Sequence, residues 1–96
     1  MLVGLGRTLV AMDRAAEARP LLEEALAIRR RRYEPGDPRT GEAMVALGEG
    51  LARLGDAGAA RPLLEQGLVA MRRRPGRPDP LIARAASRLD RLALAP

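Results

Sequence analysis

The chain has 96 residues, of which 47% are hydrophobic and 30% are charged, and its formal net charge is +5. This length gives one small domain, and the balance of apolar and charged residues indicates a folded chain rather than a disordered one. The sequence contains no Cys and no His, which excludes disulfides, thiolate metal sites and histidine-based nucleophilic catalysis. We therefore expect no enzymatic activity, no catalytic residues, no metal site and no cofactor.

The scarcity of aromatic residues predicts an all-helical fold. Tyr33 is the single aromatic residue, so the core has to be built from Leu and Ala with a few Met, Val and Ile. Leu, Ala and Met are good helix formers, whereas strands favour β-branched and aromatic residues.

No segment of the sequence predicts a membrane span or a targeting signal. No stretch reaches the roughly 18 consecutive apolar residues that a spanning helix needs. Residues 1–12 are apolar enough to be compared with a short signal peptide, but Arg7 interrupts the run and no positive region precedes it. We expect no membrane contact and a cytoplasmic location.

Apolar spacing and turn residues predict five helices, in chain order at about residues 1–12, 15–32, 38–54, 57–73 and 80–94. The third segment illustrates the pattern: Asp37 is placed to cap it, and Pro38 stands at the first helical position, where a missing N–H costs nothing. Its apolar residues recur every three or four positions, as Met44, Leu47, Leu51 and Leu54. Asp56 is placed to cap the next helix.

The sequence repeats with a period of about 42 residues, the offset between Leu5 and Leu47. The matching segments are Leu5-Gly6 with Leu47-Gly48, Ala18–Glu23 with Ala60–Glu65, and Arg30–Arg32 with Arg72–Arg74. Between Leu5 and Pro38, 16 of 34 positions are identical to their counterparts, far more than chance would give. A third, partial copy begins at Asp79-Pro80, so we predict one domain, 1–96, made of three units: 1–36, 37–78 and 79–96.

The order of small and large residues in each unit resembles that of tetratricopeptide repeats. In the second unit the pattern reads Leu47-Gly48, Leu51, Ala60, Leu64 and Gly67, and in the first it reads Leu5-Gly6, Leu9, Ala18, Leu22 and Ala25. The long period is similar to that of the kinesin-light-chain-like variety, which is found at the C-terminal end of bacterial serine/threonine kinases and regulators. The resemblance implies a right-handed α-α superhelix of antiparallel helix hairpins that serves as a protein–protein interaction module in a signalling protein.

The number of units is low for a repeat stack, because such stacks need about three units for independent stability. We therefore expect the chain to be the terminal part of a longer array, with the helix at 80–94 as its cap. The alternative is a self-contained protein that covers its exposed end helices by self-association.

The resemblance also implies a partner-binding groove lined by the first helix of each hairpin. By motif position, the groove residues are Val3, Arg7, Val10 and Ala11 in the first unit, Glu42, Val45, Glu49, Ala52 and Arg53 in the second, and Arg84, Ser87, Arg91 and Leu94 in the third. We expect a mildly basic, weakly apolar groove for an extended or helical peptide of acidic character. The alternative is an ordinary solvated surface.

Four consecutive arginines, Arg29–Arg32, close the second predicted helix. Successive residues of a helix advance by about 100°, so these side chains cannot form one flat patch. Positive charges in the last turn of a helix are stabilised by the helix dipole. We expect Glu23 and Glu24 to pair with Arg19 and Arg30.

The alternative reading of these arginines is a nucleic-acid-associated regulator that uses the arginine-tipped helices. Such binding would be salt-dependent and would lack aromatic stacking.

Overall fold

The computed structural model describes residues 2–73 and 80–94. Within these ranges the chain forms five helices, α1 (Leu2–Ala11), α2 (Ala15–Arg32), α3 (Pro38–Arg53), α4 (Ala57–Met71) and α5 (Pro80–Leu94). The predicted all-helical fold is therefore confirmed, and no helix end differs from its predicted position by more than two residues. The predicted unit boundary between residues 78 and 79 lies outside the described ranges.

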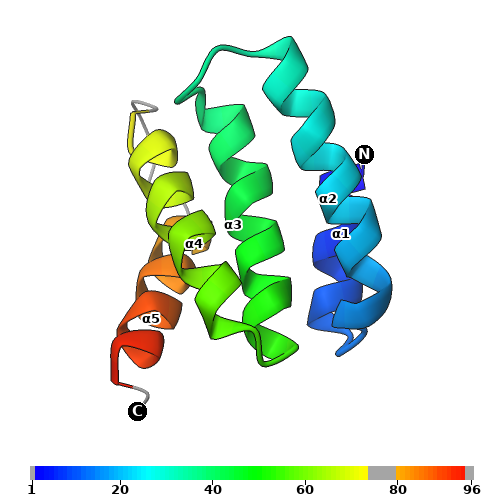
Figure 1. The fold of residues 1–96 in the computed structure, drawn as a ribbon, viewed down its shortest axis with the longest axis vertical. Coiled ribbons are helices and arrows are strands. Elements are labelled where there is room, and N and C mark those ends of the chain that lie inside the picture. Colours follow the sequence, from blue (N-terminus) through cyan, green and yellow to red (C-terminus); the bar gives the residue numbers. More distant parts are fainter. Residues whose placement is uncertain (1, 74–79, 95–96) are drawn as a thin grey trace.

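Successive helices run antiparallel, and α2 and α4 lie in front of α1 and α5 in Figure 1. The helix α3 packs against α1, α2, α4 and α5 and is the centre of the molecule. The first helices of the three units, α1, α3 and α5, are therefore neighbours on the side away from the viewer. This arrangement gives the antiparallel hairpins of a tetratricopeptide-like fold.

The core is a seam of leucine and alanine that repeats from one unit to the next. Leu22 in α2 and Leu64 in α4 occupy equivalent positions, and both side chains are fully buried. Ala18 and Ala60, one helical turn earlier, are buried as well. Equivalent positions of the two hairpins are therefore buried alike, as the repeat predicts.

The helices α3 and α4 approach so closely that glycine is required on both sides of their crossing. A Cβ atom on Gly41 would lie 2.8 Å from the carbonyl oxygen of Gly67, and a Cβ atom on Gly67 would lie 2.8 Å from that of Gly41. Contacts this short do not occur for real Cβ atoms, so a side chain at either position would push the helices apart.

The turns that connect the two helices of each hairpin share one backbone geometry. The amide of Arg14 donates to the carbonyl of Leu9 at 2.8 Å, and the amide of Asp56 donates to the carbonyl of Leu51 at 2.9 Å. Both bonds close the same type of helix C-terminus, in which one residue adopts a left-handed conformation. The repeat therefore extends from the sequence to the hydrogen bonds.

The two turns differ in the residues that form them. The left-handed residue is Gly55 in the second hairpin, with φ of 88°, and Asp13 in the first, with φ of 62°. The side chain of Asp56 caps α4 by accepting a hydrogen bond from the amide of Ala59 at 3.2 Å, which confirms its predicted role. Arg14 stands at the equivalent position and makes no side-chain capping bond.

The connection between α2 and α3 is fixed by a small polar cluster. Asp37 caps α3, as predicted, by accepting a hydrogen bond from the amide of Arg39 at 2.8 Å. The guanidinium of Arg39 pairs with the same carboxylate at 2.9 Å and lies 3.8 Å from the ring centre of Tyr33. The hydrogen bond to Asp37 raises the pKa of Arg39. Tyr33, the C-cap residue of α2, therefore stacks against the guanidinium of Arg39.

Candidate functional site

A pocket of about 290 Å³ lies between α3 and α5, on the side where the first helices of the units meet. It is lined by Glu49 from α3 and by Ala83, Arg84, Ser87, Arg88 and Arg91 from α5. Four of the predicted groove residues, Glu49, Arg84, Ser87 and Arg91, therefore come together around one hollow. The predicted residues Arg7, Glu42 and Arg53 lie outside its lining.

Arg88 belongs to this pocket although its motif position did not predict it. Its guanidinium pairs with the carboxylate of Glu49 at 3.5 Å, and the exposed fractions of the two side chains are 22% and 11%. The signal was present in the sequence, because Arg84, Arg88 and Arg91 follow the spacing of one helical face. The pair neutralises the carboxylate that the pocket contains.

The second groove carboxylate, Glu42, is also neutralised by an arginine. Arg29 reaches across from the end of α2 and pairs with Glu42 at 2.8 Å, and it also donates to the backbone carbonyl of Arg39. Thr40, which is buried, donates its hydroxyl to the carbonyl of Arg29 at 3.5 Å. The sequence predicted only an interaction of Arg29 with the helix dipole, whereas the structure adds an ion pair with α3, because α2 ends beside the first turn of α3.

The four arginines predicted for the groove, Arg7, Arg53, Arg84 and Arg91, are exposed. Within residues 2–73 and 80–94, none of these four has a carboxylate partner. Because Arg29 and Arg88 neutralise the two groove carboxylates, the four exposed arginines leave this side with a positive charge.

Three predicted groove residues belong to the core instead. Val45 is fully buried, and Val3 and Val10 are almost fully buried. The close approach of α4 explains the burial of Val45. A Cβ atom on Gly67 would lie 2.7 Å from the Cγ2 atom of Val45, so α4 can pack this closely on Val45 only because Gly67 has no side chain. Ala11 is exposed and Ala52 is half-buried, while the side chain of Leu94 lies outside the described part of the structure.

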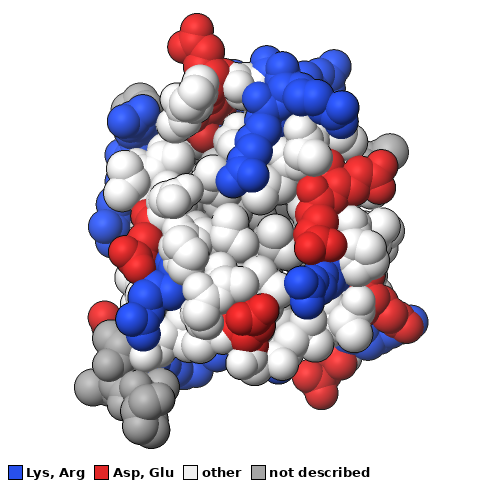
Figure 2. All heavy atoms as spheres, in the orientation of Figure 1, with Lys and Arg blue, Asp and Glu red and all other residues white. Residues whose placement is uncertain are grey.

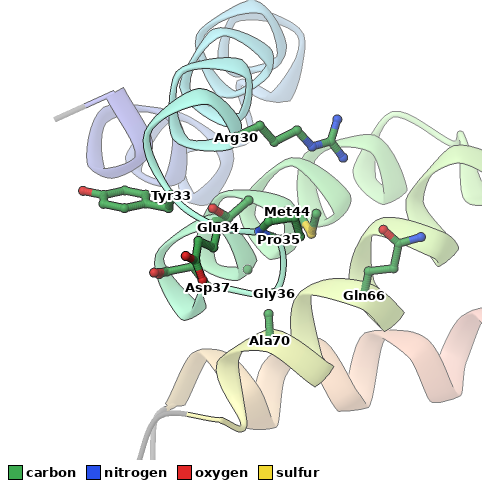
Figure 3. A pocket seen from close by; sticks show the side chains of 11 residues that line it. Arg30, Tyr33, Glu34, Pro35, Gly36, Asp37, Met44, Gln66 and Ala70 are labelled. Atoms are coloured by element: carbon green, nitrogen blue, oxygen red, sulfur yellow. The ribbon is translucent and has the colours of Figure 1, made fainter.

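A larger pocket of about 470 Å³ lies on the opposite side, between α2 and α4. Its lining comes from the end of α2, the connection to α3, the first turns of α3, and α4. Figure 3 shows Arg30 and Gln66 on opposite sides of this pocket, with Met44 between them. The sequence did not predict this pocket, because its walls come from segments that only the tertiary packing brings together.

The exposed charges of the helix surfaces are mixed in sign. The predicted pair of Arg19 with Glu23 is present at 3.4 Å, whereas Arg30 extends over the larger pocket and has no ion pair within the described ranges. Figure 2 shows basic side chains gathered over the C-terminal end of α2, with acidic groups on the same face and uncharged atoms in its middle. This face is therefore no continuous basic surface.

None of the helices in the described ranges combines the length and apolarity that crossing a membrane would require.

Comparison with protein families gives one match. Residues 1–73 match the family described as tetratricopeptide repeat, which is more than half of the chain, and the chain therefore belongs to that family. Comparisons with curated proteins and with solved structures give no match.

Proposed function

Since tetratricopeptide repeats are general protein–protein interaction modules, we propose that this chain binds an acidic, extended peptide of a partner protein in the groove lined by α1, α3 and α5. The observation that supports this proposal is the charge balance of the groove. Glu42 and Glu49 are each paired with an arginine, whereas the arginines at positions 53, 84 and 91 are exposed. A carboxylate-bearing peptide would supply the partners that these arginines lack within residues 2–73 and 80–94.

The spacing of the groove arginines suits an extended ligand. Arg84 and Arg91 are seven residues apart on α5, a rise of about 10 Å along a helix. In a polyproline-II segment, side chains three residues apart point the same way and are separated by about 9 Å. A peptide with acidic residues at positions i and i+3 would therefore place both carboxylates within reach of the two guanidinium groups.

The test uses a fluorescein-labelled peptide with Glu at every third position, titrated with the full chain by fluorescence anisotropy. The groove variant carries Arg53→Glu and Arg91→Glu. The control variant carries Arg31→Glu and Arg72→Glu, which make the same change of net charge at exposed arginines outside the groove. We expect the groove variant to weaken binding by about tenfold or more, equivalent to ~1.4 kcal/mol, and the control to change it by about twofold at most.

Equal losses in the two variants would show that only the net charge matters, and the groove proposal would then be wrong. A pull-down from a lysate of the source cells with the wild-type chain and the same two variants extends the test to natural partners. Partners that remain bound to the groove variant would also contradict the proposal.

A second candidate function, association with nucleic acid through the arginine-tipped helices, is supported by the exposure of Arg30, Arg31 and Arg32. It is less favoured because Arg29, the first arginine of the run, is held by Glu42.

The wider setting of the chain is also part of the proposal. The long period of the repeat supports the kinesin-light-chain-like variety, with units at 1–36, 37–78 and 79–96, in a bacterial signalling protein. A location in the reducing cytoplasm completes this proposal. We propose a binding role without catalysis, because the sequence has no His to serve as the base of a nucleophilic triad and no Cys to serve as its nucleophile.

A further inference from the structure

A hollow separates the end of α2 from α4, because within the described residues both helices pack on α3 and not on each other. This hollow is the larger pocket, of about 470 Å³, which falls within the range of ~300–1,000 Å³ that is usual for small-molecule sites. It lies on the side of the molecule away from the groove of α1, α3 and α5. The proposed peptide binding therefore makes no use of it.

The floor of the pocket is apolar and closely packed. Met44 of α3 is half-buried, and Ala70 of α4 is buried beside Gly41. A Cβ atom on Gly41 would lie 2.7 Å from the Cβ atom of Ala70, so α3 and α4 leave no space between them at this point. Pro35 adds an apolar wall from the connection between α2 and α3. Burial against these residues would favour the entry of an apolar group.

Arg30 extends over the pocket from the last turn of α2, and its guanidinium points away from Glu34 (Figure 3). Among the described residues it has no carboxylate partner. Gln66 of α4 lies across the pocket from Arg30, at the position where the first unit of the repeat has Glu24. An uncharged amide therefore stands where a carboxylate would have given Arg30 a partner.

A second guanidinium lies at the rim of the pocket. Arg73, just past the end of α4, lies against Gly36, where an added Cβ atom would be 3.2 Å from the Cζ atom of Arg73. Arg73 also has no ion pair in the part of the chain that the structure describes. The acidic residues of the lining are Asp37, which is held by Arg39, and Glu34, which is exposed. The two guanidinium groups outnumber the remaining carboxylate, so the pocket favours an anion.

We propose that this pocket binds a small organic carboxylate with an apolar chain. The planar guanidinium of Arg30 donates to the two carboxylate oxygens, and the amide of Gln66 donates from the opposite wall. The apolar chain lies on Met44 and Ala70. An apolar floor below a positive rim suits a molecule that combines both properties better than it suits inorganic phosphate or an uncharged hydrocarbon.

The test titrates the full chain with octanoate. Tyr33 lines the pocket and is the single aromatic residue of the chain, so its fluorescence reports on this site. Isotope-labelled methionine methyl groups, observed by NMR, locate the ligand: Met44 should shift to saturation, and Met12, in the turn between α1 and α2, should not shift. Octanamide has the same chain without the charge. It should bind about fivefold more weakly, equivalent to ~1 kcal/mol, the upper end for exposed ion pairs.

Substitutions at exposed positions assign the binding to this pocket. Arg30→Gln should weaken octanoate binding by about fivefold. Arg31→Gln is the matched control, because it removes the same charge outside the lining, and it should change the affinity by less than about twofold. Gln66→Glu places a carboxylate opposite Arg30 and should weaken binding by about tenfold. The melting temperature of each variant should stay within about 3 °C of the wild-type value.

The inference is wrong if the methyl group of Met44 does not shift, if octanamide binds as tightly as octanoate, or if Arg30→Gln and Arg31→Gln weaken binding equally. Unchanged or tighter binding by Gln66→Glu would also contradict it, because the added carboxylate would stand beside that of the ligand. The variants of the peptide test, at positions 31, 53, 72 and 91, lie outside the lining of this pocket. The two proposals can therefore fail separately.

Discussion

Gly48 of α3 lies directly against Leu64 of α4, so close that a Cβ atom on Gly48 would be 2.8 Å from the leucine Cγ. The first hairpin repeats this relationship with Gly6 and Leu22. Both leucines are fully buried, so each hairpin places its largest fully buried side chain against a position without one. The glycines that weaken these helices locally are therefore the residues that let the helices pack.

We predict that Gly48→Ala destabilises the protein although alanine is the better helix former. Overpacking of a close contact costs ~1–3 kcal/mol, which exceeds the ~0.5–1 kcal/mol that alanine gains over glycine in a helix. The net loss in the free energy of unfolding should be about 1 kcal/mol, measured by urea denaturation.

Gly4→Ala is the matched control, because an added Cβ there meets nothing within 4 Å. It should stabilise the chain by ~0.5–1 kcal/mol through helix propensity alone. If Gly48→Ala stabilised the protein as well, the close approach of Leu64 would not be tight enough to matter.

The arginines that end α2 should differ in their contributions to stability. Arg29 pairs with Glu42 and donates to the carbonyl of Arg39, so it ties α2 to α3. Hydrogen bonds to charged groups contribute ~1.5–3 kcal/mol, less where solvent screens them. We expect Arg29→Ala to lower the free energy of unfolding by ~1–2 kcal/mol, and Arg31→Ala, an exposed neighbour, to change it by less than ~0.5 kcal/mol.

Glu42→Gln provides the second half of this measurement. Glu42→Gln should remove most of the contribution of Arg29 to the free energy of unfolding. Arg29→Ala should therefore lower that free energy by less in the Glu42→Gln variant than in the wild-type chain. Additive effects would show that the two side chains contribute independently.

The two hairpin turns should respond in opposite ways to an exchange of their capping residues. Asp56→Ala removes the side chain that accepts from the amide of Ala59, and the loss of such a cap costs about 1 kcal/mol. Arg14→Asp places a cap at the equivalent position of the first hairpin and creates a capping box with Glu17, three residues later. We expect the melting temperature to fall in the first variant and to rise in the second. The substitution also removes the exposed ion pair of Arg14 with Glu17, so Arg14→Ala, which removes the pair without adding a cap, is the reference. A melting temperature of Arg14→Asp below that of Arg14→Ala would mean that the turn around Asp13 cannot accept the cap.

Binding of duplex DNA should be weak, despite a net charge of +5. Arg29 and Arg39 are held by Glu42 and Asp37, and acidic groups share the face that carries the exposed arginines. We expect no measurable anisotropy change with a labelled duplex at low ionic strength. Binding that falls steeply as salt is raised, with a slope of about −0.9 per phosphate contacted, would instead support the nucleic-acid function.

The candidate site was predictable in part. The motif positions found Glu49, Arg84, Ser87 and Arg91, which line one pocket, because residues on one helical face keep a fixed angular spacing. They failed for Val45, because its burial depends on how closely α4 approaches. They also did not predict that Glu42 pairs with Arg29, because a long side chain at the end of one helix can reach another helix that the sequence pattern treats as separate.

The sequence by itself determined the five helices, their caps at Asp37 and Asp56, and the phase in which two hairpins stack, because helix period, turn chemistry and the repeat are local or periodic properties. Only the tertiary structure decided which charges are paired and which apolar faces are covered. Leu5 and Leu47 are the same residue at the same position of the repeat, yet one is exposed and the other is buried. The difference lies in the preceding hairpin, which packs on α3 and which α1 does not have within the described residues.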